Sequence, residues 1–103
     1  RMARTGMLFI YPQDGGTKDN KFRIDITKAK FKNLTDPLSK TCQCYTCQNF
    51  SSAYINHLFL AHEMLGARLG AVHNIYFVND LMTKIRSAIE NGDFEAFRKH
   101  WLE

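Results

Sequence analysis

Several features are missing from this 103-residue chain. No apolar run approaches the ~18 residues that a membrane-spanning helix needs, and no segment has the pattern of a secretion signal. No internal repeat or low-complexity tract is present. These absences favour one globular domain, or a piece of one, in the cytoplasm and with no membrane partner. The chain opens on Arg1, and we expect a fragment of a longer protein.

The common catalytic constellations are missing as well. We find no paired carboxylates, no Ser-His-Asp set and no glycine loop of the kind that cradles phosphate. Gly15-Gly16 lies in a segment rich in turn formers and indicates a turn. We therefore assign no catalytic residue within this chain.

Cysteine is scarce but concentrated. The three cysteines, Cys42, Cys44 and Cys47, lie within six residues. An odd number excludes a framework that pairs them all, and a Cys-x-Cys pair bridges poorly, so a reducing compartment is favoured. Three converging thiolates suit zinc, which takes four Cys or His ligands in a tetrahedron. Reduced free thiols and an iron–sulfur cluster are the alternatives, but the cluster would be one cysteine short.

The fourth ligand has four candidates. His57 and His62 lie five residues apart within one expected helix, and His100 lies in the expected last helix. His73 lies near the expected junction of two helices, where a side chain can turn toward the cysteines. Spacing alone leaves the choice open. With four protein ligands the single zinc ion would be structural, because no position remains for water or substrate.

Positive charge is concentrated in the first half of the chain. Residues 1–51 carry 9 basic and 4 acidic side chains, a net of +5, and residues 52–103 carry 5 and 6, a net of −1. This asymmetry indicates a polyanion partner or, alternatively, a solvated face. Arg1 and Arg4, just before Gly6, could clamp phosphate or read a base edge, or could form a solvated terminus.

The first half of the chain predicts short strands. Residues 6–11 are apolar and β-rich, residues 12–20 are dense in turn formers, and residues 21–27 alternate with a period of two. The alternation continues through residues 28–32, where three lysines line up. We expect an antiparallel hairpin that leads to the cysteines.

The second half predicts helices. Ser51 or Ser52 can cap a first helix whose apolar positions continue to Leu65, with Gly66 and Gly70 as a weak point or a break. A second helix follows apolar steps of three and four, and the last helix presents aromatic side chains on one face. The apolar positions of these two helices are Ile75, Val78, Met82, Ile85 and Ile89, then Phe94, Phe97 and Trp101.

An aromatic face leaves the cysteine segment. Phe50, Tyr54 and His57 recur at steps of three and four residues. Such a face is most often core, and an interface is the alternative.

Several motifs in a fixed order carry a resemblance. They are Arg1-Met2-Ala3-Arg4-Thr5-Gly6, the cysteine segment, residues 51–58, Leu65-Gly66-Ala67 and His73-Asn74-Ile75. Together they resemble the C-terminal part of the tRNA-guanine transglycosylases, also called queuine tRNA-ribosyltransferases; Ser52 replaces the usual basic residue. The family's zinc pattern has its histidine 26 residues after the last cysteine, which His73 satisfies. The resemblance thus implies a zinc site of Cys42, Cys44, Cys47 and His73.

The resemblance also implies a fold and a reaction. The fold would be α/β, the C-terminal piece of a TIM-type (β/α)8 barrel, with short antiparallel strands, a zinc knuckle, then two or three helices. Residues 1–50 would hold strands and knuckle, and residues 51–103 the helical part with the closing barrel helix, as one unit. Family enzymes exchange guanine in tRNA anticodons for a deazaguanine base, queuine or its precursor. The catalytic aspartates would lie upstream, so this piece alone should be inactive.

Partners follow from the same resemblance. Arg1 and Arg4 match positions that contact the tRNA anticodon loop, and Phe50, Tyr54 and His57 match a dimer interface. The partner subunit would be identical or a family relative. Three other functions stay open: a non-catalytic partner subunit of the same family, a relative that acts at another tRNA position or on DNA, and a stand-alone zinc module that binds RNA.

Overall fold

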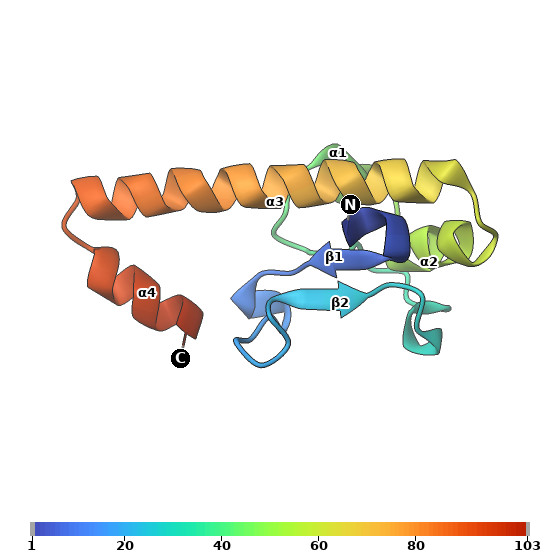
Figure 1. Cartoon of the computed structure of the whole chain (residues 1–103), viewed down its shortest axis with the longest axis horizontal. Helices are drawn as coiled ribbons and strands as arrows, with labels where there is room; N and C mark the ends of the chain where they lie inside the picture. Colours follow the sequence, from blue (N-terminus) through green and yellow to red (C-terminus); the bar gives the residue numbers. More distant parts are fainter. Residues whose placement is uncertain (1, 103) are drawn as a thin grey trace.

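The structure is a computed structural model that describes residues 2–102, and its elements follow one another in a simple order. An antiparallel pair of strands comes first, then a loop with the cysteines, then helices (Figure 1). The elements are η1 (Met2–Thr5), β1 (Met7–Phe9), η2 (Pro12–Asp14), β2 (Arg23–Asp25), η3 (Ala29–Phe31), α1 (Tyr45–Asn49), α2 (Ser52–Leu60), α3 (Met64–Glu90) and α4 (Phe94–Leu102). The predicted order of strands, cysteine segment and helices is confirmed.

The two strands are shorter than the sequence pattern predicts. β1 and β2 pair with Leu8 opposite Ile24. Residues 12–20 form the connection, as predicted, and the side chain of Asn20 organises it by bonding backbone groups within it. β2 begins only at Arg23 because Lys21 and Phe22 have φ near +58° and +57°, in the left-handed region. The loop therefore extends two residues into the predicted strand.

The predicted continuation of the strand over residues 28–32 is wrong. This segment contains η3, and Phe31 is its buried residue. The period of two breaks down because the Asn56 side chain of α2 bonds the carbonyls of Ile26 and Lys28, at 2.6 and 3.2 Å. A distant buried amide thus sets the local backbone, which pattern reading along the chain cannot detect.

The helices divide at a different place from the prediction. The break lies at residues 61–63, where His62 has φ +57°, and not at the two glycines. α3 then runs unbroken for 27 residues, so His73 lies well inside a helix rather than at a junction. Gly66 serves close packing instead: a Cβ there would lie 3.1 Å from the Cβ of Leu58 on α2.

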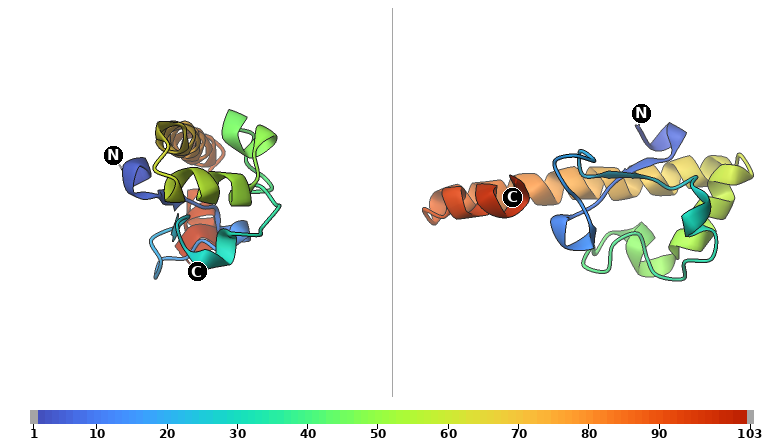
Figure 2. Two further views of the ribbon diagram at one scale, coloured as in Figure 1. Left: turned by 90° about the vertical axis from the view of Figure 1, so that its right-hand side faces the viewer. Right: turned by 90° about the horizontal axis from the view of Figure 1, so that it is seen from below.

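Helix α3 is the long axis along which everything else is arranged. The two strands, the segment of residues 42–47 that holds the cysteines (the knuckle) and α2 lie along one half of it. Helix α4 folds back beside its other end (Figures 1 and 2). Its packed face buries Leu69, His73 and Phe77. Trp101 of α4 packs on Phe77 and on Tyr11 of the hairpin, with ring centroids 5.9 and 6.2 Å apart. The core therefore lies between the hairpin and one face of α3.

The opposite side of α3 carries a second apolar stripe. The sequence pattern identified this stripe by its apolar steps of three and four, and most of its side chains are exposed in this chain. Its exposed members are Ile75, Val78, Met82 and Ile89, of which Ile75 is 63% exposed. Within residues 2–102, no helix combines the length and hydropathy that crossing a membrane requires.

Candidate metal centre

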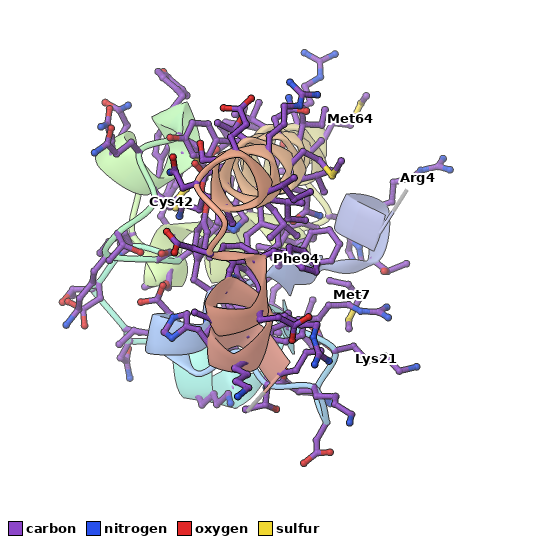
Figure 3. The ribbon with its side chains drawn as sticks, turned by 90° about the vertical axis from the view of Figure 1, so that its left-hand side faces the viewer. Arg4, Met7, Lys21, Cys42, Met64 and Phe94 are labelled. Atoms are coloured by element: carbon purple, nitrogen blue, oxygen red, sulfur yellow. The ribbon has the colours of Figure 1, made fainter. Side chains whose placement is uncertain are left out.

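The three cysteines and His73 converge in the interior. All four side chains are buried, and His73 has no exposed surface. Their ligand atoms all lie within 4.8 Å of one another, although His73 comes from α3, Cys47 from α1, and Cys42 and Cys44 from the loop before α1. In Figure 3, Cys42 lies beside α3, on the opposite side of that helix from Arg4 and Met64. The structure thus brings together the four predicted zinc ligands.

The spacing of these atoms fits a tetrahedral zinc ion. Bond lengths of about 2.3 Å to sulfur and about 2.1 Å to nitrogen give sulfur-to-nitrogen edges of about 3.6 Å. The distances from His73 Nδ1 to the sulfurs of Cys42, Cys44 and Cys47 are 3.7, 3.6 and 3.3 Å. Three soft thiolates with one imidazole are a donor set typical of structural zinc. The four residues are positioned to bind one metal ion, and zinc fits them.

The knuckle is shaped by hydrogen bonds to its own sulfurs. Cys44 precedes α1 as its N-cap, and its Sγ accepts from the backbone N–H of Cys47 at 3.3 Å. The N–H of Cys44 points in the same way at the Sγ of Cys42, at 3.5 Å. Donors directed at sulfur favour the thiolate form, which is the form that binds metal. Thr46 fastens this turn to α3 by donating to the carbonyl of Leu69 at 2.7 Å.

A hydrogen bond made by Nε2 of His73 orients the imidazole ring so that Nδ1 faces the cysteines. Nε2 lies 2.7 Å from the carbonyl oxygen of Phe9, which can only accept, so Nε2 carries the proton and donates. In the neutral ring, which is the form that binds metal, Nδ1 then directs its lone pair at the centre of the three sulfurs. Metal-binding histidines commonly have such an outer partner, which fixes the ring orientation.

Asn74, the next residue along α3, holds the same strand. Its side chain accepts from the N–H of Phe9 at 3.0 Å and donates to the carbonyl of Met7 at 3.1 Å. A side-chain amide thus occupies the edge of β1 that β2 leaves open. Sequence analysis missed this role; the available signal was a polar residue on the packed face of a helix.

The pKa values of Cys44, Cys47 and His73 are shifted by their closeness to one another. Hydrogen bonds from the Cys42 and Cys47 thiols lower the pKa of Cys44, whereas the same cluster raises the pKa of Cys47. Burial alone would lower the pKa of His73, but the Cys42 and Cys44 sulfurs and the Phe9 carbonyl outweigh it and raise that pKa to about 9. Without a metal, protons therefore hold this cluster together, and a divalent cation would replace them.

The other histidines lie away from this centre. His57, His62 and His100 are exposed and belong to no group of converging ligands within the part of the chain that the structure describes. This agrees with the choice of His73, although the expected reason, a junction of two helices, is wrong. His73 reaches the cysteines because it lies on the packed face of α3, directly over the knuckle.

The remaining predicted site residues are on the surface or outside the description. Arg1 lies outside the described residues. Arg4 is exposed and borders a shallow groove with Phe59, Glu63 and Met64. The rings of Phe50 and Tyr54 stack with centroids 5.2 Å apart. His57 and Tyr54 are exposed.

The ring of Tyr45 extends this aromatic group. It packs edge-on against Phe50 at 5.9 Å between centroids, and it is 60% exposed. Sequence analysis missed Tyr45 because the short helix α1 that presents it was not predicted. Tyr45, Phe50 and Tyr54 therefore form one surface, which we call the aromatic ladder.

Comparison with known proteins gives a consistent result. The family model described as "Queuine tRNA-ribosyltransferase" matches residues 1–103. A protein of Archaeoglobus fulgidus is 47% identical over 102 residues, covering 99% of this chain and 25% of its own length. The queuine tRNA-ribosyltransferases of Francisella tularensis and Methylobacillus flagellatus are 46% and 45% identical, over 99% and 94% of this chain. The chain spans about a quarter of the length of these relatives.

The ligand set leads to a direct prediction. We expect His73→Ala to lose the bound zinc, about one ion per chain, and to unfold. The binding energy of structural zinc, roughly 10–16 kcal/mol in small modules, is comparable to the whole stability of a domain. Elemental analysis and circular dichroism measure the two effects. His100→Ala removes an exposed imidazole and should change neither; a His73→Ala protein with full zinc and stability would contradict the assignment.

Proposed function

The chain belongs to the queuine tRNA-ribosyltransferase family, and we propose that it is the C-terminal zinc-binding part of an enzyme of that kind. The enzyme would exchange guanine in a tRNA anticodon for a deazaguanine base, queuine or its precursor, in the cytoplasm. The observation that carries this proposal is the buried Cys₃His centre within a chain matched over its whole length by the family model. The reacting groups belong to the remainder of the enzyme.

The role of this chain would be structural: it would hold other groups of the enzyme in position. Zinc, when bound, supplies a structural cross-link, because the four protein ligands fill its tetrahedral coordination. His73 and Asn74 then hold β1 against α3, and β1 begins two residues after η1 ends. η1 carries Arg4, so the centre also determines where that guanidinium lies. A flipped anticodon base leaves its edges free for such an arginine, and we propose that Arg1 and Arg4 contact the anticodon loop.

We further propose that α3 is the closing helix of a TIM-type barrel, with residues 1–50 and 51–103 forming one unit beside it. The support is the second apolar stripe of α3, which nothing among the described residues covers. An α-helix with two apolar faces is typical of an element that packs between two layers. The relatives have about three quarters of their length outside the matched region, enough to supply the second layer.

The aromatic ladder, with His57, is our proposed dimer interface, to a second copy or to a family relative. Stacked rings that remain exposed lose contact with water when a partner covers them, and tyrosine is enriched among the residues that dominate interface energies. The ladder lies at the start of α2, on segments that the zinc knuckle fixes.

Base exchange tests the proposed function. The full-length protein should incorporate labelled guanine into a tRNA with guanine at the wobble position, and not into the same tRNA with adenine there. Binding of the tRNA without incorporation would instead indicate a non-catalytic partner subunit. Tight, salt-sensitive binding of tRNA by the 103-residue chain alone, with no exchange by the longer protein, would favour a stand-alone module.

Substitution in the ladder tests the interface. Tyr54→Ala in the full-length protein should weaken the dimer by about 2 kcal/mol, roughly 30-fold in the dissociation constant, because it removes a stacked ring. Sedimentation equilibrium measures the change. Leu60→Ala is the matched control, since Leu60 is exposed on the same helix but six residues along, on a different face. A dimer unaffected by Tyr54→Ala would exclude the ladder as its interface.

A further inference from the structure

Cys42 is the cysteine of the metal centre that lies farthest from regular structure. Cys47 lies inside α1 and Cys44 is the N-cap of that helix, whereas Cys42 lies in the loop between η3 and α1. The backbone N–H of Cys42 donates to a side chain, the hydroxyl oxygen of Ser39, at 3.2 Å. Ser39 is itself buried, with 2% of its surface exposed. The position of Cys42 therefore depends on how that hydroxyl is held.

The hydroxyl of Ser39 is held by Asp14. Ser39 Oγ donates to Asp14 Oδ2 at 2.5 Å, a short bond of the kind that a carboxylate acceptor forms. This donation uses the single proton of the hydroxyl, so its lone pairs are left for the N–H of Cys42 and for Thr41 Oγ1, which lies 3.3 Å away. Asp14 therefore determines the direction in which Ser39 accepts.

Asp14 lies on a backbone turn that is fixed in turn to α3. The N–H groups of Asp14 and Gly16 both donate to the carbonyl of Tyr11, at 3.0 and 2.9 Å. Gly16 has no room for a side chain, since a Cβ there would lie 2.7 Å from the carbonyl oxygen of Ile10. Tyr11 is buried, and its hydroxyl donates to Asp80 of α3 at 2.7 Å. A chain of hydrogen bonds thus runs from α3 through the hairpin loop to Cys42.

We infer that Asp14 and Ser39 are positioning residues of the zinc centre, which hold Cys42 in the orientation that binds the metal. Asp14 acts through Ser39, and Ser39 acts through the backbone N–H of Cys42. The Phe9 carbonyl does the same for the ring of His73. Groups that orient a metal ligand from behind lower the reorganisation that binding requires, and loss of one typically lowers metal affinity about 10- to 100-fold.

The inference gives the connection between the two strands a role in metal binding. Asp14 and Ser39 are 25 residues apart along the chain, and the bond between them joins the hairpin to the segment that leads into the knuckle. The centre is thus held at two places by the hairpin, at His73 through β1 and at Cys42 through η2.

Zinc affinity of the full-length protein, measured by competition with a chelator, tests the inference. Ser39→Ala and Asp14→Ala should each raise the dissociation constant of zinc about tenfold. The double variant should lose no more than Ser39→Ala alone, because Asp14 acts through Ser39. Asp14→Asn should recover most of the loss, since an amide oxygen also accepts from the hydroxyl. Asp36→Ala is the matched control, because it removes an exposed carboxylate that pairs with Lys40 at 3.8 Å, and it should not change the affinity.

Limited alkylation of the zinc-loaded protein, mapped by mass spectrometry, locates the effect. In Ser39→Ala and Asp14→Ala the reaction of Cys42 should accelerate several-fold relative to that of Cys47, whereas a general loosening of the fold would accelerate both alike. Equal acceleration, zinc affinity unchanged in Asp14→Ala, or additive losses in the double variant would overturn the inference. If Ser39→Ala does not fold, Asp14→Ala decides with Asp14→Asn, because the Asp14 side chain is only half-buried.

Discussion

The imidazole of His73 is the contact on which the rest of the structure depends. Its Nδ1 completes a site with the three cysteine sulfurs, and its Nε2 holds the Phe9 carbonyl of β1. One side chain therefore joins the knuckle, the hairpin and the long helix. Because the ring is fully buried, removing the metal would leave a polar group and three thiols in the interior without their common partner.

Different parts of the molecule provide its stability and its proposed binding surfaces. The packed side of α3 and the zinc centre stabilise the chain, whereas the proposed points of interaction lie on its surface. Arg4 and the aromatic ladder lie on short segments, which need a rigid support to present side chains in a fixed arrangement. The zinc centre, Asn74 and Asn56 provide that support through hydrogen bonds to backbone groups. The second apolar stripe of α3 is exposed, which leaves one long apolar face of this helix uncovered by the described residues.

The sequence predicted features that depend on local pattern. Cysteine spacing identified the knuckle, alternation identified the hairpin, and steps of three and four identified the helices. Resemblance to a family, rather than spacing, selected His73, because choosing among four histidines requires knowing which face of α3 is packed. The structure confirms the antiparallel hairpin and the three helices that follow the knuckle.

Two of the errors come from contact between distant residues. Asn56 turns the predicted strand at residues 28–32 into η3, and Gly66 permits close packing of α2 instead of ending a helix. The pattern also showed that the helix face with Ile75 and Met82 is apolar, but a pattern does not show which of two apolar faces this chain covers.

X-ray absorption spectroscopy at the zinc edge of the purified protein tests the central claim most directly. The account predicts three sulfur neighbours at about 2.3 Å and one nitrogen neighbour at about 2.1 Å, with the multiple-scattering signature of a single imidazole. A shell of four sulfurs, or one dominated by oxygen and nitrogen, would contradict it.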